Sequence, residues 1–268
     1  MNRLLARKWL RKAAILAGKA VAQHHPGKAQ ATAVQSHDWI HLAERAGHAK
    51  FLNTLSGPFP SQPMKDGLGL VLSTDEEWCF RWFALDVPST YLRGARQWMT
   101  GCGVRRMDAQ ANDPVAVFDV IAIYSAAENT LYHASRAEGD CRRNTSLLRP
   151  VHSGIAHAAD MRTGLLVADG AVASPEVWAQ FLDVFPQSKW APLVAGPFEA
   201  CVALAQGQID ALLVPEPLLQ EELVQLGLSF AACAGIQCAS GPGFSLFAHG
   251  SVLKAIRGTT VRKAQSFP

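Results

Sequence analysis

The chain has 268 residues, of which 49% are hydrophobic and 18% are charged, and its formal net charge is +3. A chain of this length and low charge content can bury the core of one large α/β domain or of two lobes. The mild net charge indicates no polyanionic partner, and the aromatic residues are not interleaved with basic ones, so we expect no nucleic-acid binding.

The six cysteines are scattered and form no C-x-x-C motif. We interpret them as reduced, mostly buried thiols of a cytoplasmic protein rather than as zinc ligands.

The first 37 residues contain seven lysines and arginines and no acidic residue. The apolar run 13-AAILAGKAVA-22 imitates a signal peptide, but Lys19 interrupts it, and the run is too short to span a membrane. We therefore predict a basic amphipathic first helix with a solvated cationic face. Such a face attracts anionic surfaces without specifying one.

The next part of the chain, up to about residue 150, is rich in predicted strands. Residues 24–36 are small and polar and predict a loop, and apolar positions at helical spacing predict a helix over 38–55. Five short apolar runs predict strands, and the turn 126-AAEN-129 makes the last two a hairpin. These runs are 68–73, 79–86, 102–107, 115–125 and 130–136. We expect an antiparallel sheet here.

After about Pro150, predicted strands alternate with predicted helices, which is the pattern of βαβ units. Ser174 and Pro175 form a helix start, and the two later helices end on glycine. The predicted strands are 164–170, 191–196 and 209–215, and the predicted helices are 174–185, 197–207 and 217–227. A short terminal helix and a mobile tail, 257–268, follow the apolar segment 244–250. We expect an α+β chain in which 1–150 and 151–268 form two halves of one compact unit.

The order of these elements resembles the inositol monophosphatase family of magnesium-dependent, lithium-sensitive phosphatases. The resemblance runs roughly over 12–256 and rests on short motifs in the family's order. These are 34-VQSHDWIHLAE-44 followed by 59-FP-60, then 128-ENTLYHASRAEGDCRRN-144, 196-GPFEACVALAQGQIDALL-213 and 234-AGI-236. The resemblance implies a layered α/β/α/β/α sandwich and, because members are commonly homodimers, a homodimer.

The segment 83-FALDVPSTYLRG-94 is similar to the family's metal motif, which reads Asp-Pro-x-Asp-Gly-Thr and continues to a glycine. With Gly94 in the place of that glycine, Asp86 takes the second aspartate and Phe83 takes the first. Several hard oxygen ligands are needed to hold the Mg²⁺ ions that polarise the phosphate and activate water. A phenylalanine supplies none, so the resemblance implies a weakened or lost metal site.

The remaining candidates are also implied by the resemblance. Asp66 stands near the place of a family Gly-Glu-Glu motif, and 75-DEE-77 is an alternative. The position of a later family aspartate falls on Leu223, next to Glu222. We therefore take three residues as candidate Mg²⁺ ligands and three as candidate substrate-binding residues. The candidate ligands are Asp86, Asp66 and Glu222, and the substrate-binding candidates are Ser89, Thr90 and Gly196.

Each candidate also has a purely structural interpretation. Asp86, with Ser89 and Thr90, would cap the turn after a strand, and Glu221 and Glu222 would lie on a solvated helix face. Asp210 would bond to backbone N–H groups at a strand start. The histidines of the first helices would be surface residues; they are His24, His25, His37, His41 and His48.

Three functions follow. The first is a catalytically eroded protein of the inositol monophosphatase type that binds a phosphorylated small molecule or a partner. The second is an active but divergent Mg²⁺-dependent phosphomonoesterase. The third is a solute-binding lobe, which the segment 199-EACVALAQGQIDALLVPEP-217 also suits, and which would show two lobes joined by a hinge.

Overall fold

The computed structural model describes residues 1–25, 33–64, 69–72, 77–92, 98–107, 117–148, 161–166, 175–185, 193–241 and 243–256. The candidates Asp66, Gly94 and Ser174 and the tail 257–268 lie outside these residues. Within the described ranges, every helix is too short or too polar to serve as a bilayer-spanning segment.

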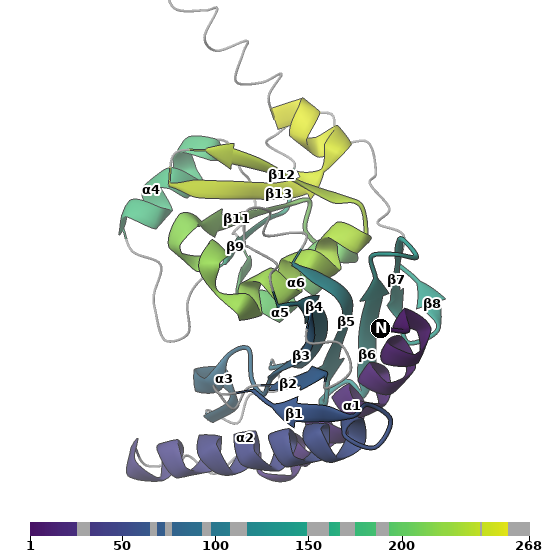
Figure 1. The fold of residues 1–268 in the computed structure, drawn as a ribbon. Helices are drawn as coiled ribbons and strands as arrows, with labels where there is room; N and C mark the ends of the chain where they lie inside the picture. The colour runs from purple at the N-terminus through teal and green to yellow at the C-terminus, as the bar shows by residue number, and fades with distance from the viewer. Residues whose placement is uncertain are drawn as a thin grey trace, which may run out of the picture.

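Helices and sheets alternate in five layers (Figure 1). A helix pair covers one face of a large antiparallel sheet, a second helix pair separates that sheet from a smaller mixed one, and further helices lie outside the smaller sheet. The predicted α/β/α/β/α sandwich is thus confirmed. The solute-binding alternative required two hinged lobes, so the layered arrangement overturns it.

The first layer contains helices α1 (Arg3–Gln23) and α2 (Ala33–Leu55). Asn2 caps α1 through its side-chain oxygen, which accepts a hydrogen bond from the backbone N–H of Leu5 at 3.1 Å. Helix α2 begins at Ala33, so the predicted loop over 24–36 was too long.

The first sheet consists of eight strands in chain order, each antiparallel to its neighbours. The strands are β1 (Ser61–Pro63), β2 (Gly69–Leu72), β3 (Trp78–Phe83), β4 (Thr100–Arg106), β5 (Phe118–Ser125), β6 (Thr130–Ser135), β7 (Asp140–Arg143) and β8 (Ser146–Leu147). The predicted hairpin is β5–β6, in which Ser125 pairs with Thr130.

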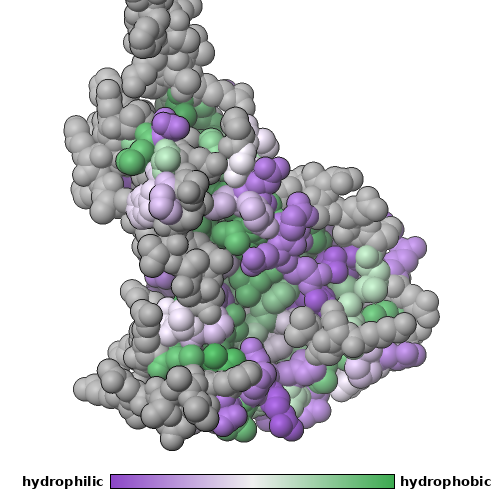
Figure 2. Space-filling view, turned by 90° about the vertical axis from the view of Figure 1, so that its left-hand side faces the viewer, coloured by the Kyte–Doolittle hydropathy of each residue, from purple (hydrophilic) through white to green (hydrophobic). Residues whose placement is uncertain are grey.

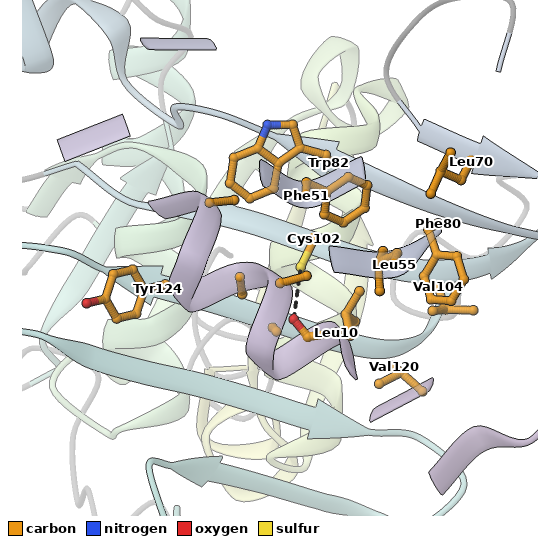
Figure 3. Packing of buried hydrophobic residues seen from close by; sticks show 14 of the residues in the cluster. Leu10, Phe51, Leu55, Leu70, Phe80, Trp82, Cys102, Val104, Val120 and Tyr124 are labelled. Atoms are coloured by element: carbon orange, nitrogen blue, oxygen red, sulfur yellow. Dashed lines mark hydrogen bonds between the residues drawn. The ribbon is translucent and has the colours of Figure 1, made fainter. Parts of the chain in front are cut away.

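The core between α1, α2 and this sheet is apolar and tightly packed (Figure 3). The rings of Phe51 from α2 and Trp82 from β3 stack with centroids 5.5 Å apart. The thiol of Cys102 donates to the carbonyl of Leu10 at 3.7 Å. The sheet's other face packs on the middle helices through a second cluster that includes Phe118, Phe198 and Leu226.

The middle layer consists of α5 (Pro197–Ala205) and α6 (Glu222–Cys233). The predicted helix over 217–227 was wrong in its bounds: a 3₁₀ helix, η2 (Glu216–Gln220), comes first, and α6 continues past Gly227. Gly227 therefore does not mark the end of a helix. Its lack of a side chain instead allows α5 to approach α6 closely at this position. A Cβ placed there would be 3.0 Å from the sulfur of Cys201.

The second sheet has the order β10-β9-β11-β13-β12. Its strands are β9 (Thr163–Leu166), β10 (Leu193–Ala195), β11 (Ala211–Pro215), β12 (Ile236–Gly241) and β13 (Phe244–His249). The first three are mutually parallel, as the βαβ pattern predicted, whereas β13 runs antiparallel to β11 and β12. The outer layer is α4 (Pro175–Val184) and a helical segment over 250–256. Trp178 of α4, Phe185 just after it and Val252 of the last segment pack in the outer core.

Candidate functional site

Asp86 lies just after β3, where the chain turns into the short helix α3 (Pro88–Leu92). Its side chain is almost completely buried. One carboxyl oxygen, Oδ1, accepts a hydrogen bond from the backbone N–H of Met99 at 2.8 Å. The other, Oδ2, is buried and meets no hydrogen-bond geometry with any described residue, although the backbone N–H groups of Glu199 and Asp86 also act on the carboxyl and lower its pKa. Burial raises the pKa of Asp86 to about 7, against the opposing effect of the Met99 N–H, and the charge of Glu199 adds to the rise. A large share of Asp86 side chains is therefore protonated at neutral pH.

Gly196, one of the substrate-binding candidates, lies against Asp86. It is the N-cap residue of α5, and a Cβ placed on it would be 3.3 Å from Oδ2 of Asp86 and 2.0 Å from a methyl carbon of Val87. The other two candidates, Ser89 and Thr90, lie in α3 with half-buried side chains. The backbone N–H of Thr90 donates to the carbonyl of Val87, which closes the turn that follows the strand.

Glu222 lies apart from Asp86, at the start of α6, and its charge is already neutralised. One of its carboxyl oxygens pairs with Arg81 of β3, and the other accepts a hydrogen bond from Arg105 of β4 at 2.5 Å. The interpretation as a solvated helix face is therefore wrong for Glu222, whereas the neighbouring Glu221 is exposed. Asp210 accepts a hydrogen bond from the backbone N–H of Arg162 at 2.8 Å, as its structural interpretation expected.

A cavity of about 320 Å³, which we call the β3 cavity, lies between α2, the end of β3 and the start of α6. Helix α2 contributes Glu44, Arg45 and His48. The end of β3 contributes Trp82 and Phe83, followed by Ala84 and Leu85, and α6 contributes Leu223. The cavity thus brings together Phe83 and Leu223, the two positions at which the resemblance implies a lost aspartate.

Two residues that line this cavity each carry a buried polar atom with no hydrogen-bond partner in the described part of the chain. These atoms are Nε2 of His48 and the indole Nε1 of Trp82. Burial lowers the pKa of His48. In Figure 3 the indole nitrogen of Trp82 points away from α1 and from Leu10. A buried donor without a partner costs free energy unless a ligand or water satisfies it.

The surface of the molecule is hollowed on the face shown in Figure 2, where hydrophobic side chains are exposed and hydrophilic ones gather along the border of the hollow. The β3 cavity has the same mixed character. Phe83, Leu85 and Leu223 make an apolar wall, and the exposed Arg45 supplies a positive charge near the partly exposed Glu44.

These residues do not fit the magnesium ions that the resemblance implies. Glu44 is the one carboxylate in the cavity wall, Arg45 beside it is cationic, and Asp86 and Glu222 are engaged elsewhere. Across the described residues, no group of three or more histidine, cysteine, aspartate or glutamate side chains is placed to hold a metal ion. Mg²⁺ requires several oxygen ligands at short distance, which this set does not supply.

Sequence reasoning missed Arg45, His48 and Trp82 as cavity residues and assigned His48 to the surface. The sequence did indicate that Arg45 and His48 could lie together. Glu44 and His48 are four residues apart on one helix and therefore share a face, and Arg45 is next to Glu44. No comparable signal existed for Trp82, whose ring also belongs to the apolar core.

Comparisons with known proteins identify solved structures that share this fold. No family model matches the sequence, and no curated protein matches it. The extragenic suppressor protein SuhB from Bartonella henselae is 15% identical with a TM-score of 0.70, covering 93% of this chain and 97% of its own. An inositol monophosphatase from Anabaena (Nostoc) is also 15% identical with a TM-score of 0.70, covering 98% and 97%. Inositol monophosphatase-II from Staphylococcus aureus is 14% identical with a TM-score of 0.66, covering 94% and 92%. The chain therefore has the inositol monophosphatase fold.

Proposed function

We propose that this protein is a catalytically eroded form of the inositol monophosphatase fold, which binds a phosphorylated small molecule in the β3 cavity without hydrolysing it. The observation that carries the proposal is the composition of the cavity wall. Apolar Phe83 and Leu223 occupy the places of implied carboxylates, and among the described residues of the wall His48 and Trp82 each have a buried ring nitrogen without a hydrogen-bond partner.

The chemistry of phosphoryl transfer explains why this wall would bind but not hydrolyse. Hydrolysis of a phosphate monoester requires stabilisation of the charge on the transferring group and an activated, positioned water molecule. In the phosphatases that this fold resembles, metal ions supply both. Here the side chains that face the cavity supply one carboxylate, and Asp86 is buried against the backbone of Met99.

The same wall has what a phosphate ester needs for binding. The Trp82 indole N–H can donate to a phosphate or hydroxyl oxygen, Arg45 supplies the compensating charge, and Phe83 and Leu223 exclude water from the apolar part of the ligand. A volume of about 320 Å³ lies at the small end of ligand pockets, which suits a sugar or inositol phosphate. A matched structure of this fold, SaIMPase-II, was determined with inositol monophosphate bound.

Two further properties belong to the proposal. The expectation of a homodimer rests on the resemblance, and light scattering on the eluting peak of a size-exclusion column would decide it. The expectation of a cytoplasmic location is supported by the six cysteines, all of which are free thiols.

The first experiment measures phosphate release from a panel of inositol, sugar and nucleotide monophosphates, with and without Mg²⁺, beside the variant Asp86→Asn. We expect no turnover from the folded protein. Mg²⁺-dependent turnover that Asp86→Asn abolishes would instead favour the active, divergent phosphomonoesterase, for which Asp86, Asp66 and Glu222 are the candidate ligands.

The second experiment measures binding of the same compounds by isothermal titration calorimetry. Arg45→Gln should weaken binding about tenfold, because it removes a charge-assisted contact. Lys50→Gln is the matched control, since Lys50 is an exposed cation of the same helix outside the cavity wall. Equal affinities for wild type and Arg45→Gln would contradict the assignment of the β3 cavity.

A further inference from the structure

A second cavity, of about 330 Å³, lies between the N-terminal half of α1 and the strands β6 to β8. We call it the α1 cavity. Figure 1 shows the N-terminus of α1 beside β6 and β8, whereas α2 and α3 lie toward the other end of the large sheet. The charged residues of the wall are Arg7, Lys8, Arg11, Glu138 and Arg142, and the ring of His133 lies at the base.

Arg7 is held in place by three side chains around this cavity. Its guanidinium pairs with Glu138 and with Asp140, the latter at 2.9 Å, and it donates to Nδ1 of His133 at 3.1 Å. The other ring nitrogen of His133 donates to the carbonyl of Asn144 at 2.8 Å, which leaves Nδ1 as an acceptor. Burial lowers the pKa of His133 to about 4, so this ring is neutral and holds Arg7 in place without adding charge.

These contacts correct the prediction that the cationic face of the first helix is solvated. The side chain of Arg7 is 11% exposed and lies against the sheet. Arg142 is also engaged, because its Nε donates to Asp140 at 2.8 Å and a terminal nitrogen donates to the carbonyl of Thr145 at 3.1 Å. The two arginines thus share one carboxylate.

Lys8 and Arg11 are different, because no carboxylate in the described part of the chain pairs with either side chain. Arg11 is half-buried, and its pKa is lowered first by burial and then by the positive charges of Arg7 and Arg142. A cation held in this way is repelled by its neighbours and has lost part of its hydration. Its placement lowers the stability of the free protein unless an anion compensates it.

We propose that the α1 cavity is a second ligand site, distinct from the β3 cavity, that binds the phosphate group of a small soluble phosphate or phosphate monoester. Lys8 and Arg11 contact its oxygens, and Arg142 borders the site.

Charge and size favour this ligand. Four cationic side chains face two carboxylates, Glu138 and Asp140, so the cavity has an excess of about two positive charges. A phosphate monoester carries roughly −1.5 to −2 charge near neutral pH, which matches that excess. Guanidinium groups bind phosphate oxygens with two parallel hydrogen bonds, and no described residue pairs with the guanidinium of Arg11.

The test measures the melting temperature and the affinity of the full-length protein for inorganic phosphate and for glycerol phosphate, in chloride buffer of matched ionic strength. The variants are Arg11→Gln and, as an exposed second position, Lys8→Gln. The control is Lys12→Gln, which makes the same charge change on the same helix. Lys12 lies over the ring of Trp9, with its Nζ 4.6 Å from the ring centroid, and is not part of the cavity wall.

For the wild type we expect phosphate to raise the melting temperature, as any ligand that binds the native state does. Arg11→Gln should raise the melting temperature in chloride, because it removes a repelled cation, and should weaken phosphate binding about tenfold. Lys8→Gln should also weaken binding, and Lys12→Gln and Arg45→Gln should leave this site unchanged.

Several results would overturn the proposal. One is that the wild type and Arg11→Gln bind phosphate equally well or not at all. Another is that Lys12→Gln weakens phosphate binding as much as Arg11→Gln does, because the effect would then come from net charge. A further experiment measures binding to vesicles of phosphatidylcholine containing phosphatidic acid. It is included because the exposed, apolar Leu4 also borders the cavity and could contact a lipid. Binding to these vesicles without binding to the soluble phosphates would replace the small ligand with a lipid headgroup.

Discussion

Asp86 and Met99 are joined by two reciprocal hydrogen bonds. The backbone N–H of Met99 donates to Oδ1 of Asp86 at 2.8 Å, and the backbone N–H of Asp86 donates to the carbonyl of Met99 at 3.1 Å. The carboxyl group therefore ties the end of β3 to the residue that precedes β4. In this position it stabilises the connection between the two strands.

The first prediction concerns pH. The pKa of Asp86 is raised to about 7 in the folded protein, above the value of about 4 for an unfolded chain, so the native state binds the proton more tightly. The contribution of this residue to the free energy of unfolding is complete below about pH 4 and is lost as the pH rises through about 7. The loss should approach about 1.4 kcal/mol per pH unit within that window.

Urea denaturation of wild type and Asp86→Asn between pH 4 and pH 7 would measure this change in the free energy of unfolding. The difference between the two proteins isolates Asp86 from other titrating groups. A difference that does not change between pH 4 and pH 7 would contradict the raised pKa.

The second prediction concerns Glu222. Glu222→Gln removes the shared partner of Arg81 and Arg105, and Arg81 has only 5% of its side chain exposed. Removing the carboxylate from this partly buried ion-pair network is costly, and because Glu222 itself is 27% exposed we expect a loss of about 1–3 kcal/mol. Chemical denaturation would measure the loss. Glu221→Gln, at the adjacent exposed position, should change stability by less than about 0.5 kcal/mol.

The third prediction concerns the contact between the large sheet and the middle helices. A Cβ placed on Gly103 of β4 would be 2.4 Å from a methyl carbon of Leu226 and 2.5 Å from the ring of Phe118. Gly103→Ala should therefore destabilise the protein by about 1–3 kcal/mol through overpacking. Gly57→Ala is the control, because a Cβ there would meet no atom within 4 Å. Equal melting temperatures for the two variants would contradict this packing.

The fourth prediction concerns Trp82. Trp82→Phe keeps an aromatic ring next to Phe51 and removes the unpartnered indole N–H. Both proteins would carry Arg11→Gln, which weakens ligand binding in the α1 cavity. With Trp82→Phe added, the affinity for inositol monophosphate should be about threefold to tenfold lower than with Arg11→Gln alone, which is the cost of one hydrogen bond. Trp9→Phe, outside the β3 cavity, should leave the affinity unchanged.

The sequence by itself determined the types and order of most elements. Apolar alternation identified β5 and β6, and Pro175 marked the start of α4, because such signals depend on neighbouring residues in the chain. The apolar identity of Phe83 and Leu223 was equally readable, and with it the expectation of a weakened metal site.

Only the tertiary structure decided what surrounds the charged candidates. Arg81 and Arg105 neutralise Glu222 from strands more than a hundred residues away in the chain, and Arg7 meets Glu138 across a similar separation. The burial that raises the pKa of Asp86 likewise comes from the packing of α5 against the turn after β3. Local patterns specify helices and strands, whereas the charge and hydration of a side chain depend on distant segments that the fold brings together.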